Sequence, residues 1–246
     1  MQTRRENNSI LAKLEFSFIE KFLPHIPPAV TPDHLTYLGL GGACLTALAF
    51  VGCLISAAFL PIAIVGLFLN WFGDSFDGNL ARYRSKERPR YGFMIDHSVD
   101  LLSTTLILIG LGASPYLPFN SACFALIIYL LFCGFVYIKV CSDGVHMLAF
   151  GGLGATEFRL LVAAWAFFIH VFRFEDAINT TFIEWPALRG IAIVDLVVGI
   201  ACCVAFLSFG VVVFRQTAKL RDSDITHLHA AASAKVVELP LRKISA

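Results

Sequence analysis

Six long apolar stretches alternate with short polar segments along this chain. A membrane-spanning helix needs about 20 mainly apolar residues, and each stretch approaches or exceeds that length. The stretches cover residues 35–56, 59–80, 92–113, 117–139, 156–173 and 187–213. The pattern therefore predicts an all-α integral membrane protein with six transmembrane helices, contained in one membrane domain at residues 31–214.

The segment before the first stretch has a different pattern. Within residues 8–23 the apolar side chains recur at helical spacing: Ile10, Leu11, Leu14, Phe18 and Phe22. Such a stripe is typical of an amphipathic helix that lies in the membrane interface, and we expect residues 1–30 to form this element. A helix packed on the flank of the bundle fits the same pattern equally well.

The basic residues are distributed unevenly over the connecting segments. If the chain crosses the membrane six times, 17 of the 19 Lys and Arg residues fall on one side. Short loops rich in Lys and Arg stay in the cytoplasm. The sequence therefore predicts cytoplasmic termini, a cytoplasmic loop at residues 82–91 and a polar cytoplasmic tail at residues 215–246. A bacterial inner membrane and a eukaryotic endomembrane both fit.

Composition and charge agree with this class of protein. Apolar residues make up 57% of the chain and charged residues 15%, whereas soluble domains carry about 25% charged residues. The formal net charge is +1, so we expect no nucleic acid partner.

Four aspartates at the end of the second stretch and in the third indicate chemistry. Asp74 and Asp77 are spaced i, i+3, and Asp96 and Asp100 are spaced i, i+4, so each pair lies on one face of a helix. Two antiparallel helices joined by a short loop bring all four together. Carboxylates in a membrane segment are costly unless they are paired or bound to metal, and oxygen ligands suit Mg²⁺ or Mn²⁺. We expect two such ions.

The residues around the aspartates suit a phosphate-containing ligand. Gly78, Ala81 and Gly92 leave room between the helices, because glycine permits a close backbone approach. The guanidinium of Arg82 can pair with a phosphate. Metals and an arginine around a diphosphate are typical of a phosphoryl-transfer site.

The complete pattern is D-x2-D-G-x2-A-R followed by G-x3-D-x3-D, and it resembles the signature of the CDP-alcohol phosphotransferase family. Its fixed positions are Asp74, Asp77, Gly78, Ala81, Arg82, Gly92, Asp96 and Asp100. Nine residues separate Arg82 from Gly92, one more than the family's usual spacing. The extra residue lies in the basic loop and affects only the expected loop geometry.

Shorter matches are similar to the choline/ethanolamine phosphotransferase branch. They are the pair Asp96-His97 with the following Asp100, and Thr156-Glu157 with Arg159. The segment Thr31–Leu40 looks like the start of the family's first span, with Asp33 in place of Asn.

The resemblance implies a homodimer that transfers a phospho-alcohol group from a CDP-alcohol donor to a lipid hydroxyl such as that of diacylglycerol, with release of CMP. Asp74, Asp77 and Asp96 would bind the metals, and Asp100 would act as ligand or general base. Gly78, Ala81 and Arg82 would border the CMP half of the donor, with Gly92 beside them. The alternative within the family is a phosphatidyltransferase, which transfers the phosphatidyl group of CDP-diacylglycerol to a soluble alcohol. A cation carrier or channel is the alternative of another class.

Three residues keep two interpretations each. His97 is either the general base or a hydrogen-bonding partner of a metal-bound Asp. Glu157 lies near the acceptor or the alcohol headgroup, or it belongs to a helix N-terminus capped by Thr156. Asp195, alone in the sixth stretch, faces the bundle interior or a water-filled cavity, or it forms a buried hydrogen bond to a neighbouring span.

Overall fold

The fold was obtained as a computed structural model that describes residues 4–6, 9–147, 154–180 and 192–237. The chain divides into two units, Met1–Cys202 and Cys203–Ala246. The first unit contains all the candidate site residues. In its described residues, the second consists of the remainder of the last helix.

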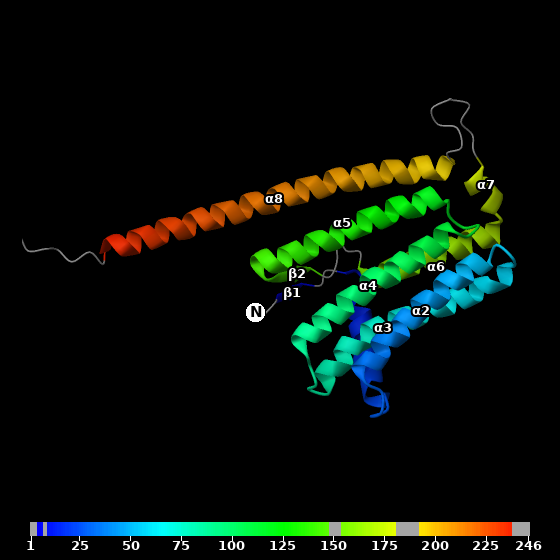
Figure 1. The fold of residues 1–246 in the computed structure, drawn as a ribbon, viewed down its shortest axis with the longest axis horizontal. Coiled ribbons are helices and arrows are strands. Elements are labelled where there is room, and N and C mark those ends of the chain that lie inside the picture. The colour runs from blue at the N-terminus through cyan, green and yellow to red at the C-terminus, as the bar shows by residue number, and fades with distance from the viewer. Residues whose placement is uncertain (1–3, 7–8, 148–153, 181–191, 238–246) are drawn as a thin grey trace, which may run out of the picture. The chain divides into compact units, whose positions relative to one another are not determined.

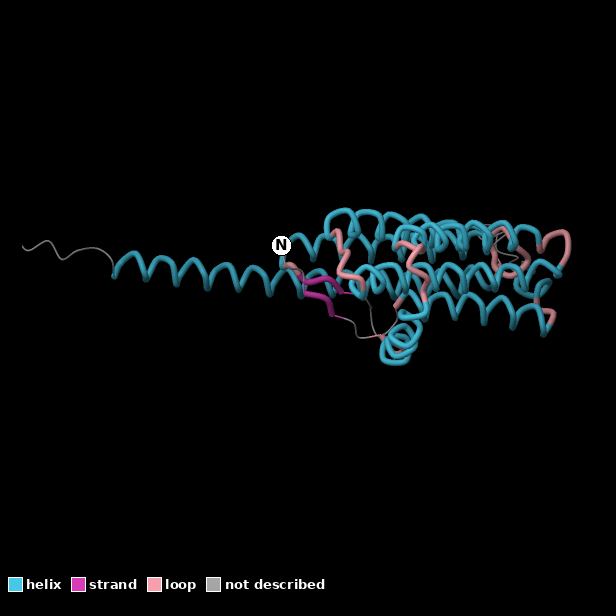
Figure 2. The backbone as a smooth tube through the Cα atoms, turned by 90° about the horizontal axis from the view of Figure 1, so that it is seen from below, coloured by secondary structure: helices cyan, strands magenta, loops and turns pink. Residues whose placement is uncertain are grey.

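Six helices in the described part of the chain are long and apolar enough to cross a membrane, as predicted. They are α2 (Pro32–Gly52), α3 (Leu60–Tyr83), α4 (Pro89–Gly112), α5 (Phe119–Asp143), α6 (Ala155–Phe172) and α8 (Ile193–Val237). The short elements between them are η2 (Ala57–Phe59) before α3 and α7 (Glu175–Asn179) after α6. Figure 1 shows α2 to α6 side by side with similar axes, and Figure 2 shows the long helices from below.

The last helix, α8, extends beyond the C-terminal end of the expected span. Residues 187–191 of the predicted stretch lie outside the described residues. At its other end α8 continues to Val237, so the polar segment expected from residue 215 begins as a continuation of the same helix. Residues 238–246 are also outside the described part.

A two-stranded sheet was not expected from the sequence. β1 (Arg4–Glu6) pairs in parallel with β2 (Val145–Met147), with Arg4 opposite Val145. Each strand has three residues, and the all-α class holds for the membrane domain.

Local sequence signals define the start of α2 and the end of α5. The hydroxyl of Thr31 accepts a hydrogen bond from the backbone N–H of His34, and Pro32 occupies the first turn, where its missing N–H costs nothing. Gly144 follows α5 with φ of 71°. Glycine adopts this left-handed conformation without the steric cost that a side chain would bring.

Two glycines bring α2 and α3 into backbone contact. A Cβ added to Gly42 would lie 2.5 Å from the backbone nitrogen of Asn70. A Cβ added to Gly73 would lie 2.4 Å from the carbonyl oxygen of Leu35. Small residues allow such close packing of membrane helices. The close approach next to Asp74 places the start of α2 beside the end of α3.

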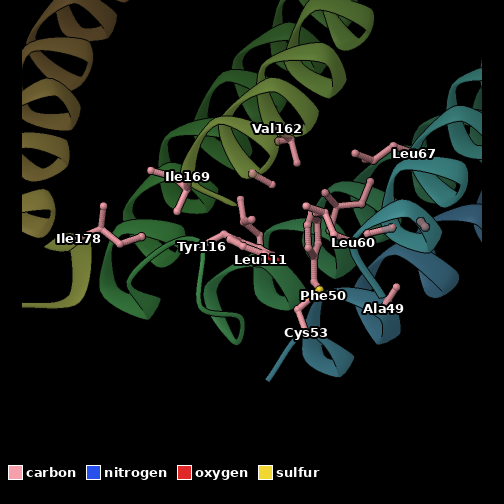
Figure 3. Packing of buried hydrophobic residues seen from close by; sticks show 14 residues of the cluster. Ala49, Phe50, Cys53, Leu60, Leu67, Leu111, Tyr116, Val162, Ile169 and Ile178 are labelled. Carbon is pink, nitrogen blue, oxygen red and sulfur yellow. The ribbon is translucent and has the colours of Figure 1, made fainter. Parts of the chain in front are cut away.

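The largest apolar cluster joins α2, α3, α4, α6 and α7 (Figure 3). Phe50 and Tyr116 are fully buried at its centre, with ring centroids 6.4 Å apart in an edge-to-face arrangement. The indole nitrogen of Trp165 donates a hydrogen bond of 2.8 Å to the carbonyl of Tyr116. This cluster connects α6, which carries Arg159, to the helices that carry the aspartates.

The N-terminal helix α1 (Ala12–Phe22) and the short helix η1 (Leu23–His25) pack on the same bundle. Ile19 and Leu23 are buried against apolar side chains of α2 and α3. On the opposite side Ile10 and Leu14, just before and within α1, are 74% and 72% exposed. Helix α1 therefore packs on the flank of the bundle. Its exposed apolar side chains are compatible with a position in the membrane interface, which stays a prediction.

Asp195 is buried in the first turn of α8. One carboxylate oxygen accepts hydrogen bonds from the backbone N–H of Ser121 at 2.9 Å and from its hydroxyl at 2.6 Å. The other oxygen accepts from Asn120 at 3.2 Å. Of the two interpretations, the hydrogen bond to a neighbouring span is the one observed, and Asp195 satisfies the N-terminus of α5.

The predicted orientation gives a first test. Ser85 and Ile55 lie in exposed loops at opposite ends of α3. In a Cys-depleted background we expect Ile55→Cys to react with an impermeant thiol reagent added outside intact cells, and Ser85→Cys to react only after permeabilisation. The physical reason is the concentration of basic residues beside Ser85. Reaction of Ser85→Cys from outside would contradict the orientation.

Candidate active site

The four aspartates of the sequence motif converge in the structure. Asp74 and Asp77 lie in the last turns of α3, and Asp96 and Asp100 in the first half of α4. All four, named the carboxylate cluster below, line one cavity of about 10 Å³ together with Thr36, Gly39, Asn70 and Val99. The convergence expected from two antiparallel helices is therefore present.

Within the carboxylate cluster, Asp74, Asp96 and Asp100 are the closest group. Each offers one carboxylate oxygen, and these oxygens all lie within 4.8 Å of one another. Three carboxylates this close repel each other unless cations offset their charge. An all-oxygen donor set of this size fits Mg²⁺ or Mn²⁺, so the residues present suit the divalent ions that the sequence predicts.

Asp77 is oriented differently. It is buried, and one carboxylate oxygen accepts a hydrogen bond of 2.6 Å from the hydroxyl of Thr36. The other oxygen accepts one of 2.5 Å from the backbone N–H of Gly78. These bonds fix the Asp77 side chain, and each oxygen retains a further lone pair for a cation. Its role as a metal ligand stays a prediction.

Arg159 reaches the carboxylate cluster from α6. Its Nη2 lies 2.9 Å from the Oδ2 of Asp74 and 4.0 Å from the Oδ1 of Asp100. The residue is only 7% exposed. From the sequence, Arg159 is only part of the match to the choline/ethanolamine phosphotransferase branch. The structure instead places it inside the site.

Asn70 is the second site residue that sequence reasoning missed. Its side-chain oxygen accepts a 2.6 Å hydrogen bond from the Nε of Arg159, and its amide nitrogen donates one of 2.9 Å to the carbonyl of Gly39. This bridge joins α6, α3 and α2. Asn70 lies one helical turn before Asp74, and a polar residue at this position in a membrane helix was the available signal.

His97 lies beside the cluster between two aromatic rings. Its ring centroid is 4.2 Å from that of Phe93 and 5.3 Å from that of Tyr137. The Nδ1 lies 3.9 Å from the Oδ2 of Asp96, which is beyond hydrogen-bond distance. The side chain is 15% exposed, so the rings restrict its orientation. This enclosure favours a positioning role for His97, and its catalytic role stays a prediction.

The expected donor-binding residues surround the end of α3. Arg82 is exposed and donates a 2.8 Å hydrogen bond to the side chain of Asn79. A Cβ added to Gly78 would lie 3.6 Å from the guanidinium of Arg82, and Ala81 is half-buried. Around Gly92 no heavy atom in the described residues lies within 4 Å of an added Cβ. Space for a ligand is thus present at Gly92, while the binding roles stay predictions.

The basic loop is anchored to the segment before α2. The guanidinium of Arg84 donates hydrogen bonds of 3.0 Å to the carbonyls of Ile26 and Pro27 and a shorter one to that of Val30. Arg88 pairs with Asp33. These contacts fix the connection between α3 and α4 and so help to hold the two pairs of aspartates together.

Glu157 contacts the N-terminal segment. Its Oε1 accepts hydrogen bonds from the backbone N–H of Leu11 at 2.8 Å and from the hydroxyl of Ser9 at 2.5 Å. Its Oε2 accepts one of 2.9 Å from the N–H of Gly154, which is the N-cap of α6 in place of Thr156. The hydroxyl of Thr156 donates to Glu15, which also accepts from Trp71 and Ser75.

These partners give a prediction for Glu157→Gln. We expect a lower Tm, because the amide oxygen of Gln can accept from Leu11 and Ser9, whereas its NH2 group cannot accept from the N–H of Gly154. The loss amounts to about 1–3 kcal/mol. The KM values for donor and acceptor should stay within about twofold. Exposed Glu20→Gln is the matched control. A KM increase of tenfold or more at unchanged Tm would restore the role near the acceptor or headgroup.

Comparisons with known proteins agree with this site. Residues 29–204 match the family model described as CDP-alcohol phosphatidyltransferase. A curated relative, Cholinephosphotransferase 1 of Gallus gallus, is 28% identical over 149 residues. The match covers 56% of this chain and 42% of the chicken protein. Because the family match covers well over half of the chain and includes the complete carboxylate cluster, the protein belongs to the CDP-alcohol phosphatidyltransferase family.

Proposed function

We propose that this protein transfers a phospho-alcohol group from a CDP-alcohol to a lipid hydroxyl and releases CMP, as one step of phospholipid synthesis. The observation that carries the proposal is the convergence of all four signature aspartates on one cavity at the ends of α3 and α4. Membership of the family supports the reaction class. A cation carrier would need a site near the middle of the membrane, whereas α3 ends only six residues after Asp77.

The aspartates of the cluster would bind the metal ions, and Arg82 would bind the phosphates of the donor. Asp74, Asp96 and Asp100 would hold divalent ions, and Asp77 would complete the set from the position fixed by Thr36. Bound Mg²⁺ or Mn²⁺ would offset the charge of the diphosphate and of the departing CMP. The exposed guanidinium of Arg82 would bind phosphate oxygens of the donor.

The chemical step forms one bond and breaks one. The acceptor hydroxyl oxygen attacks the phosphorus that bears the alcohol, and the bond from this phosphorus to the bridging oxygen breaks, so that CMP leaves. The hydroxyl proton passes to a carboxylate, which we assign to Asp100. His97, enclosed by Phe93 and Tyr137, would keep the neighbouring Asp96 in its orientation.

We infer an aminoalcohol such as choline or ethanolamine as the donor's headgroup and a diacylglycerol-like acceptor. The supporting observations are the His97 and Thr156-Glu157 matches in the sequence and the name of the chicken relative. We further propose a homodimer with its active sites facing the cytoplasm, as the family resemblance and the basic loops imply. Cross-linking in native membranes tests the dimer.

The experiment that tests the reaction uses purified protein in lipid vesicles. Release of labelled CMP is measured from CDP-choline and CDP-ethanolamine with diacylglycerol, and from CDP-diacylglycerol with glycerol phosphate, inositol phosphate or serine. We expect metal-dependent release in the first set alone. Release in the second set alone would favour the alternative family reaction, and cation flux without CMP release would overturn the enzyme assignment.

A further inference from the structure

Arg159 is a permanent cation inside a site that is expected to receive metal cations. It is 7% exposed and carries its charge beside two of the four carboxylates, those of Asp74 and Asp100. Its Nη1 is buried and has no hydrogen-bond partner among the described residues. Burying a charged group with an unsatisfied donor is costly. The residue therefore needs a function that outweighs this cost.

The position of Arg159 is fixed independently of the carboxylates. Its Nε donates to Asn70, which donates in turn to the carbonyl of Gly39 in α2. The guanidinium thus has one edge held by the packed α2–α3 pair. The Nη2 of the same guanidinium lies 2.9 Å from the Oδ2 of Asp74 and 4.0 Å from the Oδ1 of Asp100.

The ion pairs matter most when the carboxylates carry no cation. The ligand oxygens of Asp74, Asp96 and Asp100 lie within 4.8 Å of one another, a distance at which like charges in a partly buried site repel strongly. A nearby guanidinium offsets part of this repulsion. Bound divalent ions would offset the same repulsion, so the guanidinium and the metal ions can each stabilise the clustered carboxylates.

We propose that Arg159 is a built-in counter-ion, a positioning residue that holds Asp74 and Asp100 in place until divalent ions bind. This inference rests on the metal site of the proposed function. Helix α6 would thus supply a positive charge, that of Arg159, to a cluster whose carboxylates all come from α3 and α4. Losing Arg159 should destabilise the protein more without metal than with it. By linkage, the variant then gains more stability from metal than the wild type does.

The test measures Tm in EDTA and in excess Mn²⁺, together with Mn²⁺ affinity by electron paramagnetic resonance. We expect Arg159→Met to lower Tm in EDTA by roughly 10 °C, as for a broken buried ion pair in a chain of this size. Mn²⁺ should raise its Tm by about twice the wild-type shift, with a correspondingly tighter Mn²⁺ affinity than that of the wild type. Arg159→Lys, which keeps the charge, should show the wild-type shift.

Lys139→Met is the matched control. Lys139 forms a partly buried ion pair with Asp143 in α5, and neither residue belongs to the carboxylate cluster. We expect its loss to lower Tm equally with and without Mn²⁺. Measurements of metal binding and unfolding do not depend on turnover, so they also report on inactive variants.

The outcomes separate this inference from the proposed function. No Mn²⁺ binding to the wild type would overturn the metal site and the inference with it. Normal wild-type binding with equal Tm shifts in Arg159→Met and the wild type would overturn the inference alone, as would a tenfold loss of affinity. If Arg159→Met can be purified in folded form only in the presence of Mn²⁺, the inference is supported, because the bound cation then replaces the guanidinium. Loss of this variant in both conditions would overturn it, since bound cations would then fail to replace the arginine.

Discussion

Replacing any one of Asp74, Asp77 or Asp96 by Asn is expected to abolish turnover in a protein that still inserts into the membrane. Asn keeps the size of the side chain and removes the negative charge that a divalent ion needs. All three line the same cavity, so each change acts on one site. The expected loss in CMP release is about 10²–10³-fold or more, the scale of removing a group that stabilises the transition state electrostatically.

The measurement should separate loss of metal from loss of fold. Mn²⁺ binding and gel-filtration behaviour are recorded for each variant beside its turnover. Asp222→Asn serves as a control, because Asp222 is exposed, is paired with Arg221 and does not belong to the sequence motif. Full activity in any two of the three variants would refute the metal-site assignment.

Asp100→Asn is expected to lower turnover by about 10²–10⁴-fold with little change in donor affinity, the effect of losing a general base. His97→Ala should have a milder effect. If His97 orients Asp96, its loss raises the metal requirement, and turnover largely recovers at saturating Mg²⁺. The enclosure of the imidazole between Phe93 and Tyr137 supports this expectation.

A metal titration of both variants decides between the two residues, with donor binding measured separately. Tyr137→Phe is a useful companion, because it keeps the ring beside His97 and removes only the hydroxyl. Recovery of Asp100→Asn at high Mg²⁺, with His97→Ala inactive throughout, would reverse the assignment and make His97 the base.

The spans and the aspartate motif could be predicted because their causes are local. A membrane span depends on the length and apolar character of one continuous stretch, and all six stretches correspond to helices in the structure. The spacing within each aspartate pair places its members on one helix face, and the short loop of residues 84–88 forces α3 and α4 to run antiparallel. The convergence of Asp74 and Asp100 on one cavity follows from these two facts.

The helix ends were less predictable. Hydropathy changes gradually across a helix terminus, whereas hydrogen bonding and turn geometry set where the helix stops. The polar residues after 214 predict a tail, and α8 continues into this segment as far as Val237. Residues such as Ala218, Lys219 and Leu220 favour helix whether or not they lie in the membrane.

The sequence by itself determined the class of protein, its six spans, its family signature and the identity of the four clustered carboxylates, because each depends on spacing within one helix or one helical hairpin. Only the tertiary structure decided which distant residues meet them. Arg159 is 59 residues from Asp100 in the chain and 4.0 Å away in space, and Glu157 reaches back to Leu11. Such contacts depend on how α1 and α6 pack against α3. That packing is set by the shapes of many side chains and by close approaches such as the one at Gly73, which no local pattern encodes.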